Sequence, residues 1–195
     1  MAGQLVEEHG QVREEQLDPE REARRRLALA QIRQYPDPVL RMRAREVESF
    51  DDDLRRLVER MTGLMQDANG VGLAATQVGV LQRVFVLQAK PEDEPRALVN
   101  PQIVDRSEET LTEDEGCLSL IGVTIPVERA LRVTVEAKDE TGADVRLELE
   151  EHAARVAQHE LDHLDGILII DRTTAEARRE ALGILRPEPI LGAIS

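Results

Sequence analysis

The clearest pattern of apolar and polar positions lies in residues 49–70, where apolar side chains return every three or four positions. This spacing places them along one side of an α-helix. Ser49 and the aspartates at 51–53 suit the N-terminal end of such a helix, and Asn69 with Gly70 suits its C-terminal end. The apolar positions are Leu54, Leu57, Val58, Met61, Leu64 and Met65. They predict a helix that packs on a core.

Short runs rich in apolar and β-branched residues predict strands between polar turns. These runs are 83–87, 97–100, 102–104, 131–137 and 144–150. The last two flank a turn with Gly142, which predicts a hairpin. A second helix is expected over about 151–165 and ends at Gly166. A further strand is expected over 167–170 and a last short helix within 174–185.

Helices and strands are partly segregated along the chain, so the predicted class is α+β. We expect antiparallel or mixed sheets packed around the helix over 151–165. Residues 1–30 are polar and read as a mobile extension or an exposed helix, with helical composition over 20–32. Residues 31–172 form the predicted domain. Residues 173–195 form the short helix and a proline-containing tail.

The net charge and the cysteine content limit the binding partners and the cellular compartment that we expect for this protein. The net charge of −14 disfavours direct binding to nucleic acid, because an acidic surface repels phosphates. No run approaches the roughly 20 apolar residues that span a membrane, and the N-terminus lacks the apolar segment of a secretory signal. Cys117 is the single cysteine, which excludes an internal disulfide and suits a reducing compartment. We therefore expect a cytoplasmic protein.

The segment "QHELDHLDG" (158–166) carries the strongest chemical signal. His159 and His163 are four residues apart and would project from one side of a helix toward one point. Glu160 follows the first histidine, near enough to act on a metal-bound water. This is the spacing of zinc-type hydrolases. Asp162 and Asp165 are interpreted as helix surface.

A catalytic metal needs a third protein ligand and an open position for water. The candidates are Cys117, His152, His9 and the many carboxylates. His152 lies seven residues before His159, about 10 Å along the helix, which is too far to share the metal comfortably. His9 lies in the polar extension. Cys117 follows Gly116, and a glycine there permits close backbone approach. A buried, inert thiol is equally compatible with the residues alone, so the third ligand stays open at this point.

The side chains of the segment "NGVGLAATQVGV" (69–80) are too small to fill a core by themselves. It suits a loop where a substrate backbone approaches the protein backbone. Gln77 offers an amide that can donate to a carbonyl oxygen. A tight turn with an exposed Gln77 is the alternative interpretation.

Three segments together, "GVGLAATQ" (70–77), "EGCLS" (115–119) and "QHELDH" (158–163), resemble the signature motifs of the peptide deformylase family. They occur in the family's order and with its approximate spacing. "QYPDPVLRMRAREVE" (34–48) also resembles the family's entry region. The resemblance covers about residues 31–172. It implies an enzyme that removes the formyl group from the N-terminal formyl-methionine of new polypeptides and releases formate.

The resemblance also implies the metal site and its contents. Cys117, His159 and His163 would hold one divalent metal, typically Fe(II), with zinc, nickel or cobalt able to occupy the site. A Cys/His/His set is compatible with each of these metals, so the residues do not select one. Nascent chains as substrates imply proximity to the ribosome.

By the same resemblance, Glu160 is the general base for a metal-activated water. The Gln77 side chain and the Leu118 backbone N–H would stabilise the developing oxyanion. Val71, Gly72 and Gly116 would line the substrate backbone, and Val156 would form a wall of the methionine pocket. These assignments complete the predicted site.

The chain departs from the family pattern at three positions. Ile121 stands in a stretch that usually contains proline, and Thr124 stands where an arginine is frequent. His152 falls where the family usually places an apolar residue near the methionine pocket. These departures concern substrate preference and pocket polarity rather than the reaction.

Two other functions compete with deformylation. An ordinary metallopeptidase usually takes His or Glu as its third ligand, so Cys117 counts against it. A non-catalytic metal-binding or redox-sensing domain would use Cys117 as a reactive thiol. Such a domain would need neither Glu160 nor Gln77.

Overall fold

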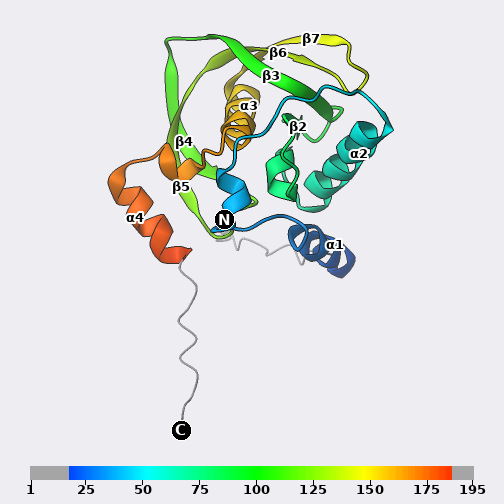
Figure 1. The fold of residues 1–195 in the computed structure, drawn as a ribbon. Coiled ribbons are helices and arrows are strands. Elements are labelled where there is room, and N and C mark those ends of the chain that lie inside the picture. The colour runs from blue at the N-terminus through cyan, green and yellow to red at the C-terminus, as the bar shows by residue number, and fades with distance from the viewer. Residues whose placement is uncertain (1–17, 186–195) are drawn as a thin grey trace, which may run out of the picture.

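The computed structural model describes residues 18–185 of the 195-residue chain (Figure 1). Its helices are α1 (Pro19–Leu29), α2 (Asp52–Asp67), α3 (Glu151–Leu164) and α4 (Ala175–Ile184). Its strands are β1 (Gly72–Ala74), β2 (Val84–Leu87), β3 (Arg96–Arg106), β4 (Thr110–Gly116), β5 (Thr124–Ala130), β6 (Arg132–Lys138) and β7 (Asp144–Glu150). Three short 3₁₀ turns cover Pro38–Arg41, Ala75–Val78 and Ile169–Asp171.

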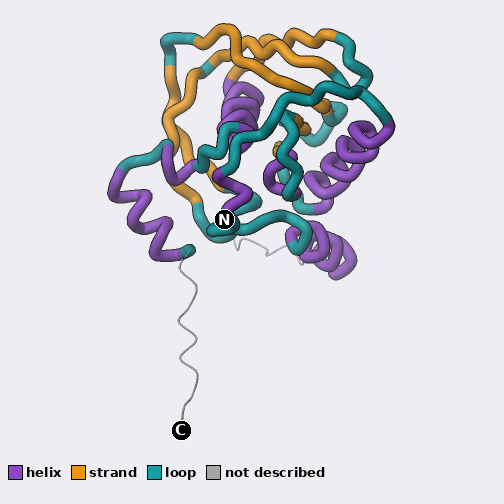
Figure 2. Tube along the Cα trace, viewed as in Figure 1, coloured by secondary structure: helices purple, strands orange, loops and turns teal. Residues whose placement is uncertain are grey.

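The strands form two antiparallel sheets. A five-stranded sheet has the order β1-β2-β3-β6-β7, and β4 pairs with β5 in a separate two-stranded sheet. Figure 2 shows the strands of both sheets curving around α3. This arrangement confirms the α+β class with sheets around the helix that carries the histidines.

Helix α2 behaves as its pattern predicts. Asp51 caps its start and accepts hydrogen bonds from the backbone N–H groups of Asp53 and Leu54. The apolar side of α2 packs into one core cluster with β1 and β2. At the C-terminal end, Asn69 takes a left-handed backbone with φ of 56°. This conformation turns the chain from α2 into the glycine-rich segment.

Helix α3 is buried on nearly all sides, which is unusual for a helix with many polar residues. Its buried positions include Arg155, Gln158, Glu160, Asp162 and His163. A buried polar side chain has to find partners or serve a function, since desolvation without a hydrogen bond is costly. The buried polar side chains of α3 therefore indicate that a functional site lies beside this helix, in the interior of the protein.

Several strand predictions are confirmed and one is wrong. The runs 97–100 and 102–104 belong to one strand, β3, whose register to β6 shifts between Val99 and Gln102. The β6–β7 hairpin forms as predicted. The strand expected over 167–170 is absent. The chain turns at Gly166, which has a φ of 74°, and then enters the 3₁₀ turn Ile169–Asp171. Their side chains fill a core cluster instead of a sheet, and a short apolar run fits either use.

The sequence interpretation missed β4 and β5. Strand β4 is mostly exposed and acidic, so it shows no apolar alternation. Strand β5 does alternate, with Ile125, Val127 and Arg129 buried, but Pro126 hides the pattern. No helix in the described residues is both long and apolar enough to cross a membrane. His9 and the proline-containing tail lie outside the described residues.

Candidate metal centre and active site

Three side chains that are far apart in the sequence meet beside α3. Cys117 directly follows β4, while His159 and His163 lie on successive turns of α3. The two Nε2 atoms of the histidines are 3.2 Å apart, and His163 Nε2 is 3.3 Å from Cys117 Sγ. All three donor atoms lie within 4.8 Å of one another. The structure therefore brings together the three predicted metal ligands.

The spacing of these donors fits a single transition metal. Tetrahedral bonds of about 2.0 Å to nitrogen and about 2.3 Å to sulfur separate the donors by roughly 3.3 to 3.6 Å. The observed nitrogen–nitrogen and sulfur–nitrogen distances lie at or near the lower end of that range. The donor set itself suits iron, cobalt, nickel or zinc.

Glu115 orients the first of the two imidazoles. Its Oε2 lies 3.0 Å from His159 Nδ1, which leaves Nε2 to face the metal position. Arg129 donates from Nε and Nη2 to the two carboxylate oxygens of Glu115, at 2.9 and 3.0 Å. Burial opposes the charge of Glu115, but the hydrogen bonds with His159 and Arg129 outweigh it and lower the pKa of the carboxyl below its usual range. Glu115 is therefore a permanent anion behind the metal ligand.

A buried ionic network extends from Glu115 through the core. Arg155 donates to Glu115 at 2.8 Å and to the carbonyls of Val127 and Leu111. Arg129 also pairs with Asp162, which in turn pairs with Arg172. The interpretation of Asp162 as helix surface is wrong, since its residue is only 8% exposed. The network ties α3 to β4, which leads directly to Cys117, and to β5, which follows the loop after it.

Asp165, by contrast, lies at the surface as expected. It is exposed just beyond α3 and pairs with Arg83 at 2.7 Å. The side chain of Arg83 is mostly buried, while that of Asp165 remains open to solvent on one side. The two aspartates of the motif segment therefore differ in role, although their spacing in the sequence gave both the same interpretation.

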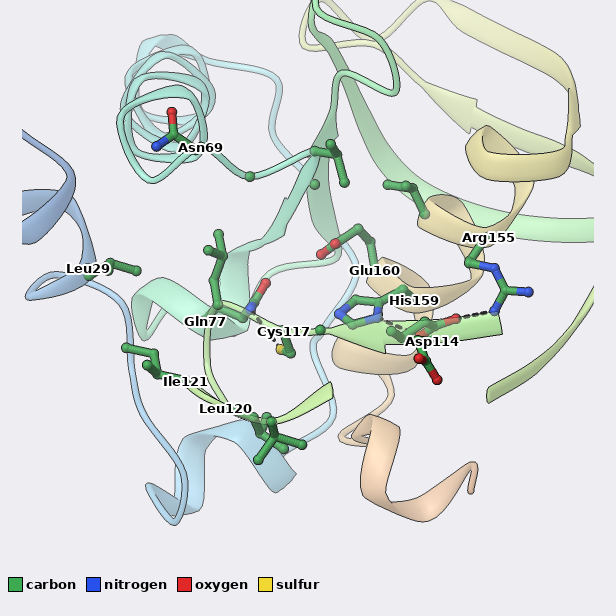
Figure 3. A pocket seen from close by; sticks show the side chains of 18 of the residues that line it. Leu29, Asn69, Gln77, Asp114, Cys117, Leu120, Ile121, Arg155, His159 and Glu160 are labelled. Carbon is green, nitrogen blue, oxygen red and sulfur yellow. Dashed lines mark hydrogen bonds and ion pairs between the residues drawn. The ribbon is translucent and has the colours of Figure 1, made fainter. Parts of the chain in front are cut away.

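Glu160 is buried with one oxygen unengaged. The residue is 3% exposed, and its Oε2 has no partner within the described part of the chain. Burial raises the pKa of Glu160 to about 7. A carboxyl with this pKa exchanges a proton readily near neutral pH, as a general base requires. Figure 3 shows its side chain directed toward the cavity beside His159.

The two histidines differ in their proton affinity. Burial lowers the pKa of His163, which keeps that imidazole neutral, as a metal ligand must be. Burial also acts against a charge on His159, but Cys117 and Glu115 outweigh it and raise the pKa of His159. The two shifts therefore have different causes: burial dominates at His163, and the neighbouring Cys117 and Glu115 dominate at His159.

Gln77 is buried and held in a fixed orientation. It lies in the 3₁₀ turn Ala75–Val78 and is 1% exposed. Its Oε1 accepts from the Ala74 N–H at 2.9 Å, and its Nε2 donates to Ser119 Oγ at 3.0 Å. Nε2 also lies 3.8 Å from Cys117 Sγ. The alternative interpretation of Gln77 as an exposed turn residue is thus contradicted.

Leu118 follows the cysteine and presents its backbone to the same region. Its carbonyl accepts from Gln34 Nε2 at 2.9 Å. Across residues 18–185 its N–H has no acceptor. The next N–H, of Ser119, lies 3.4 Å from Cys117 Sγ. The backbone at Leu118 therefore has one donor available beside the metal position.

A cavity of about 750 Å³ opens onto these groups. Of the ten predicted site residues, nine line it and the tenth, His163, lies beneath them; the lining residues are Val71, Gly72, Gln77, Gly116, Cys117, Leu118, Val156, His159 and Glu160. Ile121 and His152 line the cavity too and are exposed. Thr124 begins β5 and is exposed. The departures at Ile121 and His152 thus face the space that a substrate would fill.

Two residues that shape the site went unassigned in the sequence. Glu115 orients His159, and Ser119 anchors the amide of Gln77. Glu115 belongs to a run of acidic residues that looks like a solvated strand. Ser119 is an ordinary small residue in a loop. Only the fold reveals that both are buried.

A thiolate and two imidazoles beside a buried carboxylate form the arrangement of a metal-dependent hydrolase. Comparison with known proteins identifies the family. Residues 29–179 match the model of the polypeptide deformylase family. A peptide deformylase of Thermotoga sp. (strain RQ2) is 47% identical over 147 residues, which are 75% of this chain and 88% of that protein. A peptide deformylase of Acidothermus cellulolyticus is 47% identical over 160 residues, 82% of this chain and 87% of that protein.

Solved structures agree with this result. The crystal structure of peptide deformylase from Thermotoga maritima has a TM-score of 0.71 at 47% identity and covers 73% of this chain and 96% of that chain. Peptide deformylase 1B of Arabidopsis thaliana, in complex with an inhibitor, has a TM-score of 0.76 at 37% identity and covers 80% of this chain and 87% of that chain. The chain belongs to the polypeptide deformylase family and is an enzyme, a hydrolase.

Proposed function

We propose that this enzyme hydrolyses the N-formyl group of the N-terminal formyl-methionine of newly made proteins and releases formate. The observation that carries the proposal is the convergence of Cys117, His159 and His163 within 4.8 Å, next to the unpartnered carboxylate oxygen of Glu160. Membership of the deformylase family supports the same reaction. A redox-sensing domain would have no use for a buried carboxylate at this position.

We propose that Cys117, His159 and His163 hold one divalent metal, Fe(II) in the native enzyme. When bound, the metal would supply Lewis acidity and would lower the pKa of a coordinated water toward neutrality. The Cys/His/His donors accept zinc, nickel or cobalt as well. Metal analysis after aerobic and anaerobic purification tests the choice, because iron on a thiolate is sensitive to air. Activity that survives air without loss would contradict iron.

Glu160 performs the proton transfers. Its carboxylate accepts a proton from the attacking water and later passes it to the amine that leaves as the new N-terminus. A pKa of about 7 suits both steps. The unpartnered Oε2 is the atom assigned to this exchange, since it is buried beside the cavity. Bond cleavage then yields formate and a polypeptide with a free methionine amine.

Gln77 and Leu118 stabilise the oxygen of the formyl group as it gains negative charge. The amide nitrogen of Gln77 has two hydrogens. One is directed to Ser119 Oγ, and the other points toward Cys117 Sγ, 3.8 Å away, beside the position proposed for the formyl oxygen. The Leu118 N–H is the second donor. Both are fixed before substrate arrives, which is the condition for effective oxyanion stabilisation.

The remaining predicted residues bind the substrate. Val71, Gly72 and Gly116 line the cavity beside the donors and leave room for the substrate backbone. Val156 is 5% exposed on α3 and forms an apolar wall for the methionine side chain. His152, on the same helix, makes this wall more polar at its outer end. The site thus accepts formyl-methionine in an extended chain.

Formate release from formyl-Met-Ala tests the proposal directly. Wild type loaded with metal is expected to release formate, and Glu160→Gln should bind the same metal but turn over about 10² to 10⁴ times more slowly. Glu148→Gln, an exposed carboxylate on β7, is the matched control and should keep the wild-type rate. Full activity of Glu160→Gln would remove Glu160 from the role of base.

We further propose that the enzyme works in the cytoplasm near the ribosome, because its substrates are new polypeptides. A thiolate metal ligand is best preserved in a reducing compartment. The net charge of −14 argues against extensive direct contact with RNA. Co-sedimentation with ribosomes that carry nascent chains, compared with empty ribosomes, tests this. Retention on empty ribosomes in high salt would contradict a purely substrate-based association.

A further inference from the structure

Strand β4 leads directly to Cys117, and polar contacts hold this strand beside α3. Among the described residues, the three apolar core clusters include none from β4. Its residues are exposed at every position except Glu115. It pairs with β5 in a sheet of two strands, and a sheet of that size is only marginally stable by itself. Polar side chains of α3 therefore have to place this strand.

Arg155 makes most of the polar contacts from α3 to β4. Its side chain is only 8% exposed. Nε donates to Glu113 at 3.0 Å, and Nη1 donates to Glu115 at 2.8 Å. Nη1 also donates to the carbonyl of Val127 at 2.9 Å, and Nη2 donates to that of Leu111 at 2.7 Å. A guanidinium has five N–H donors, so β4 and β5 engage nearly all of them.

The contacts between α3 and the chain that leads to Cys117 follow one another in step. Arg155, His159 and His163 are each four residues apart, so they share one side of α3. Opposite them, Glu115 lies 3.0 Å from His159 Nδ1, and Cys117 Sγ lies 3.3 Å from His163 Nε2. Figure 3 shows Arg155 and His159 on the same helix, directed toward the strand that ends beside Cys117.

The helix and the strand advance by nearly equal distances along this row. Four residues of an α-helix rise about 6 Å, and two residues of a strand rise about 6.6 Å. A helix position and the fourth position after it can therefore face alternate residues of the strand. Arg155 begins the row, and the pair of His163 and Cys117 ends it. A shift of β4 along α3 at the first contact would be carried to the last.

Glu115 does not need Arg155 for neutralisation of its charge. Arg129 already donates to both carboxylate oxygens of Glu115, from Nε and Nη2. Two of the four acceptors of Arg155 are backbone carbonyls, which carry no net charge. A planar guanidinium that binds both side chains and backbone fixes the geometry of a strand, which a point charge does not.

We infer that Arg155 is a positioning residue of the metal site, which holds β4 in register with α3 and so sets where Cys117 Sγ stands relative to the two histidines. The inference rests on the metal site of the proposed function. Loss of the register should weaken metal binding about 10- to 100-fold, the range found for groups that orient metal ligands without touching the metal. The contact to sulfur should change most.

Titration of the full-length, metal-free chain with Co(II) tests this inference. Cobalt is the probe because its visible spectrum reports the number of ligands, and a bound thiolate adds a charge-transfer band in the near ultraviolet. Wild type is expected to develop this band on binding. Arg155→Lys keeps the positive charge without the planar fork, and Arg155→Met removes both. Both variants should bind Co(II) about 10- to 100-fold more weakly, with a weaker or shifted thiolate band at saturation.

Two controls separate the register from charge and from stability. Arg132→Lys changes an arginine of β6 that also pairs with a glutamate, Glu109, but at the surface. It should keep the affinity for Co(II) and the band of wild type. Leu54→Ala removes a buried side chain of α2 and should lower the stability of the fold. Its thiolate band should nevertheless match that of wild type. Chemical unfolding of every metal-free variant measures the stability.

Four outcomes would overturn the inference. One is wild-type affinity and an unchanged band in both Arg155 variants. Another is full recovery in Arg155→Lys beside a loss in Arg155→Met, which would assign the effect to charge. The third is loss of folded structure in both, which would assign Arg155 to the fold alone. The fourth is a wild-type chain that binds no Co(II), which removes the metal site as well.

The proposed function is checked separately by formate release from formyl-Met-Ala. A wild-type chain that binds Co(II) with the thiolate band and releases no formate would contradict the function, while the spectra of the Arg155 variants would still decide the positioning role. A wild-type chain that releases formate, with spectra of Arg155→Lys and Arg155→Met equal to its own, would leave the function intact and overturn the role of Arg155.

Discussion

Gly72 leaves the space that the carboxylate of Glu160 occupies. A Cβ on Gly72 would lie 2.4 Å from Oε1 of Glu160 and 2.8 Å from its Cδ. Non-bonded carbons do not approach oxygen so closely, so any side chain at position 72 would displace the carboxylate. The glycine does more than give room to a substrate backbone: it fixes where the proposed base stands.

Gly72→Ala is therefore expected to reduce kcat for formyl-Met-Ala by about 10²-fold, the loss typical of a catalytic group displaced by about 1 Å. Metal content should be unchanged, because the three atoms nearest to this Cβ all belong to Glu160 and none to a proposed metal ligand. Gly63→Ala is the control, since a Cβ there meets no atom within 4 Å. It should keep full activity and stabilise α2 by about 1 kcal/mol. Wild-type kcat in Gly72→Ala would refute the steric argument.

Gln77→Ala should reduce kcat/KM by about 10²- to 10³-fold, as expected for removal of one oxyanion donor. The metal ligands are retained, so metal binding should persist. Ser119→Ala serves for comparison: it removes the group that orients the amide while Gln77 itself remains. A fall of less than tenfold is expected there. Equal losses in the two variants would mean that Gln77 acts only through local structure.

Glu115→Gln should weaken metal binding by about 10- to 100-fold, because the anion that orients His159 is lost. It should also destabilise the fold by about 3 to 5 kcal/mol, since Arg129 and Arg155 are left as buried charges without a full partner. Metal competition and chemical unfolding measure the two effects. Glu113→Gln, whose carboxylate is 52% exposed, should change neither by much. A metal affinity equal to that of wild type in Glu115→Gln would contradict the orienting role.

The pair of Arg41 and Asp171 predicts a stability term that depends on pH. Partial burial disfavours the charge of Asp171, but Arg41 and the Leu168 N–H outweigh this and hold its pKa below the usual range. A lowered pKa in the folded state means that the term is present above the unfolded pKa and is lost as the pH falls through the folded one. Asp171→Asn should thus be less stable than wild type at pH 7, and the difference should shrink in acid. A difference that grows in acid would reverse the assignment.

The sequence predicted those features that depend only on residues close together along the chain. The spacing of His159 and His163 requires only a helix, and the apolar side of α2 follows from its own periodicity. The match of three separate segments to one family supplied Cys117, which residue chemistry alone left open among several candidates. These features depend on short stretches of chain, so a pattern can carry them.

The parts that were missed depend on contacts across the fold. Asp162 looks like a surface acid until β5 brings Arg129 against it. Glu115 and Ser119 gain their roles only when β4 and its loop pack beside α3 and Gln77. Residues 167–170 fill a core as a turn, which an apolar run cannot distinguish from a strand. Long-range pairing of this kind leaves no mark in the local pattern.

Removal and return of the metal test the central claim most directly. The wild-type chain is treated with a chelator, assayed for formate release from formyl-Met-Ala, and assayed again after one equivalent of Fe(II) or Ni(II) is added without air. We expect no turnover from the stripped protein and restored turnover with about one metal bound per chain. A stripped protein that releases formate at the full rate would contradict the account.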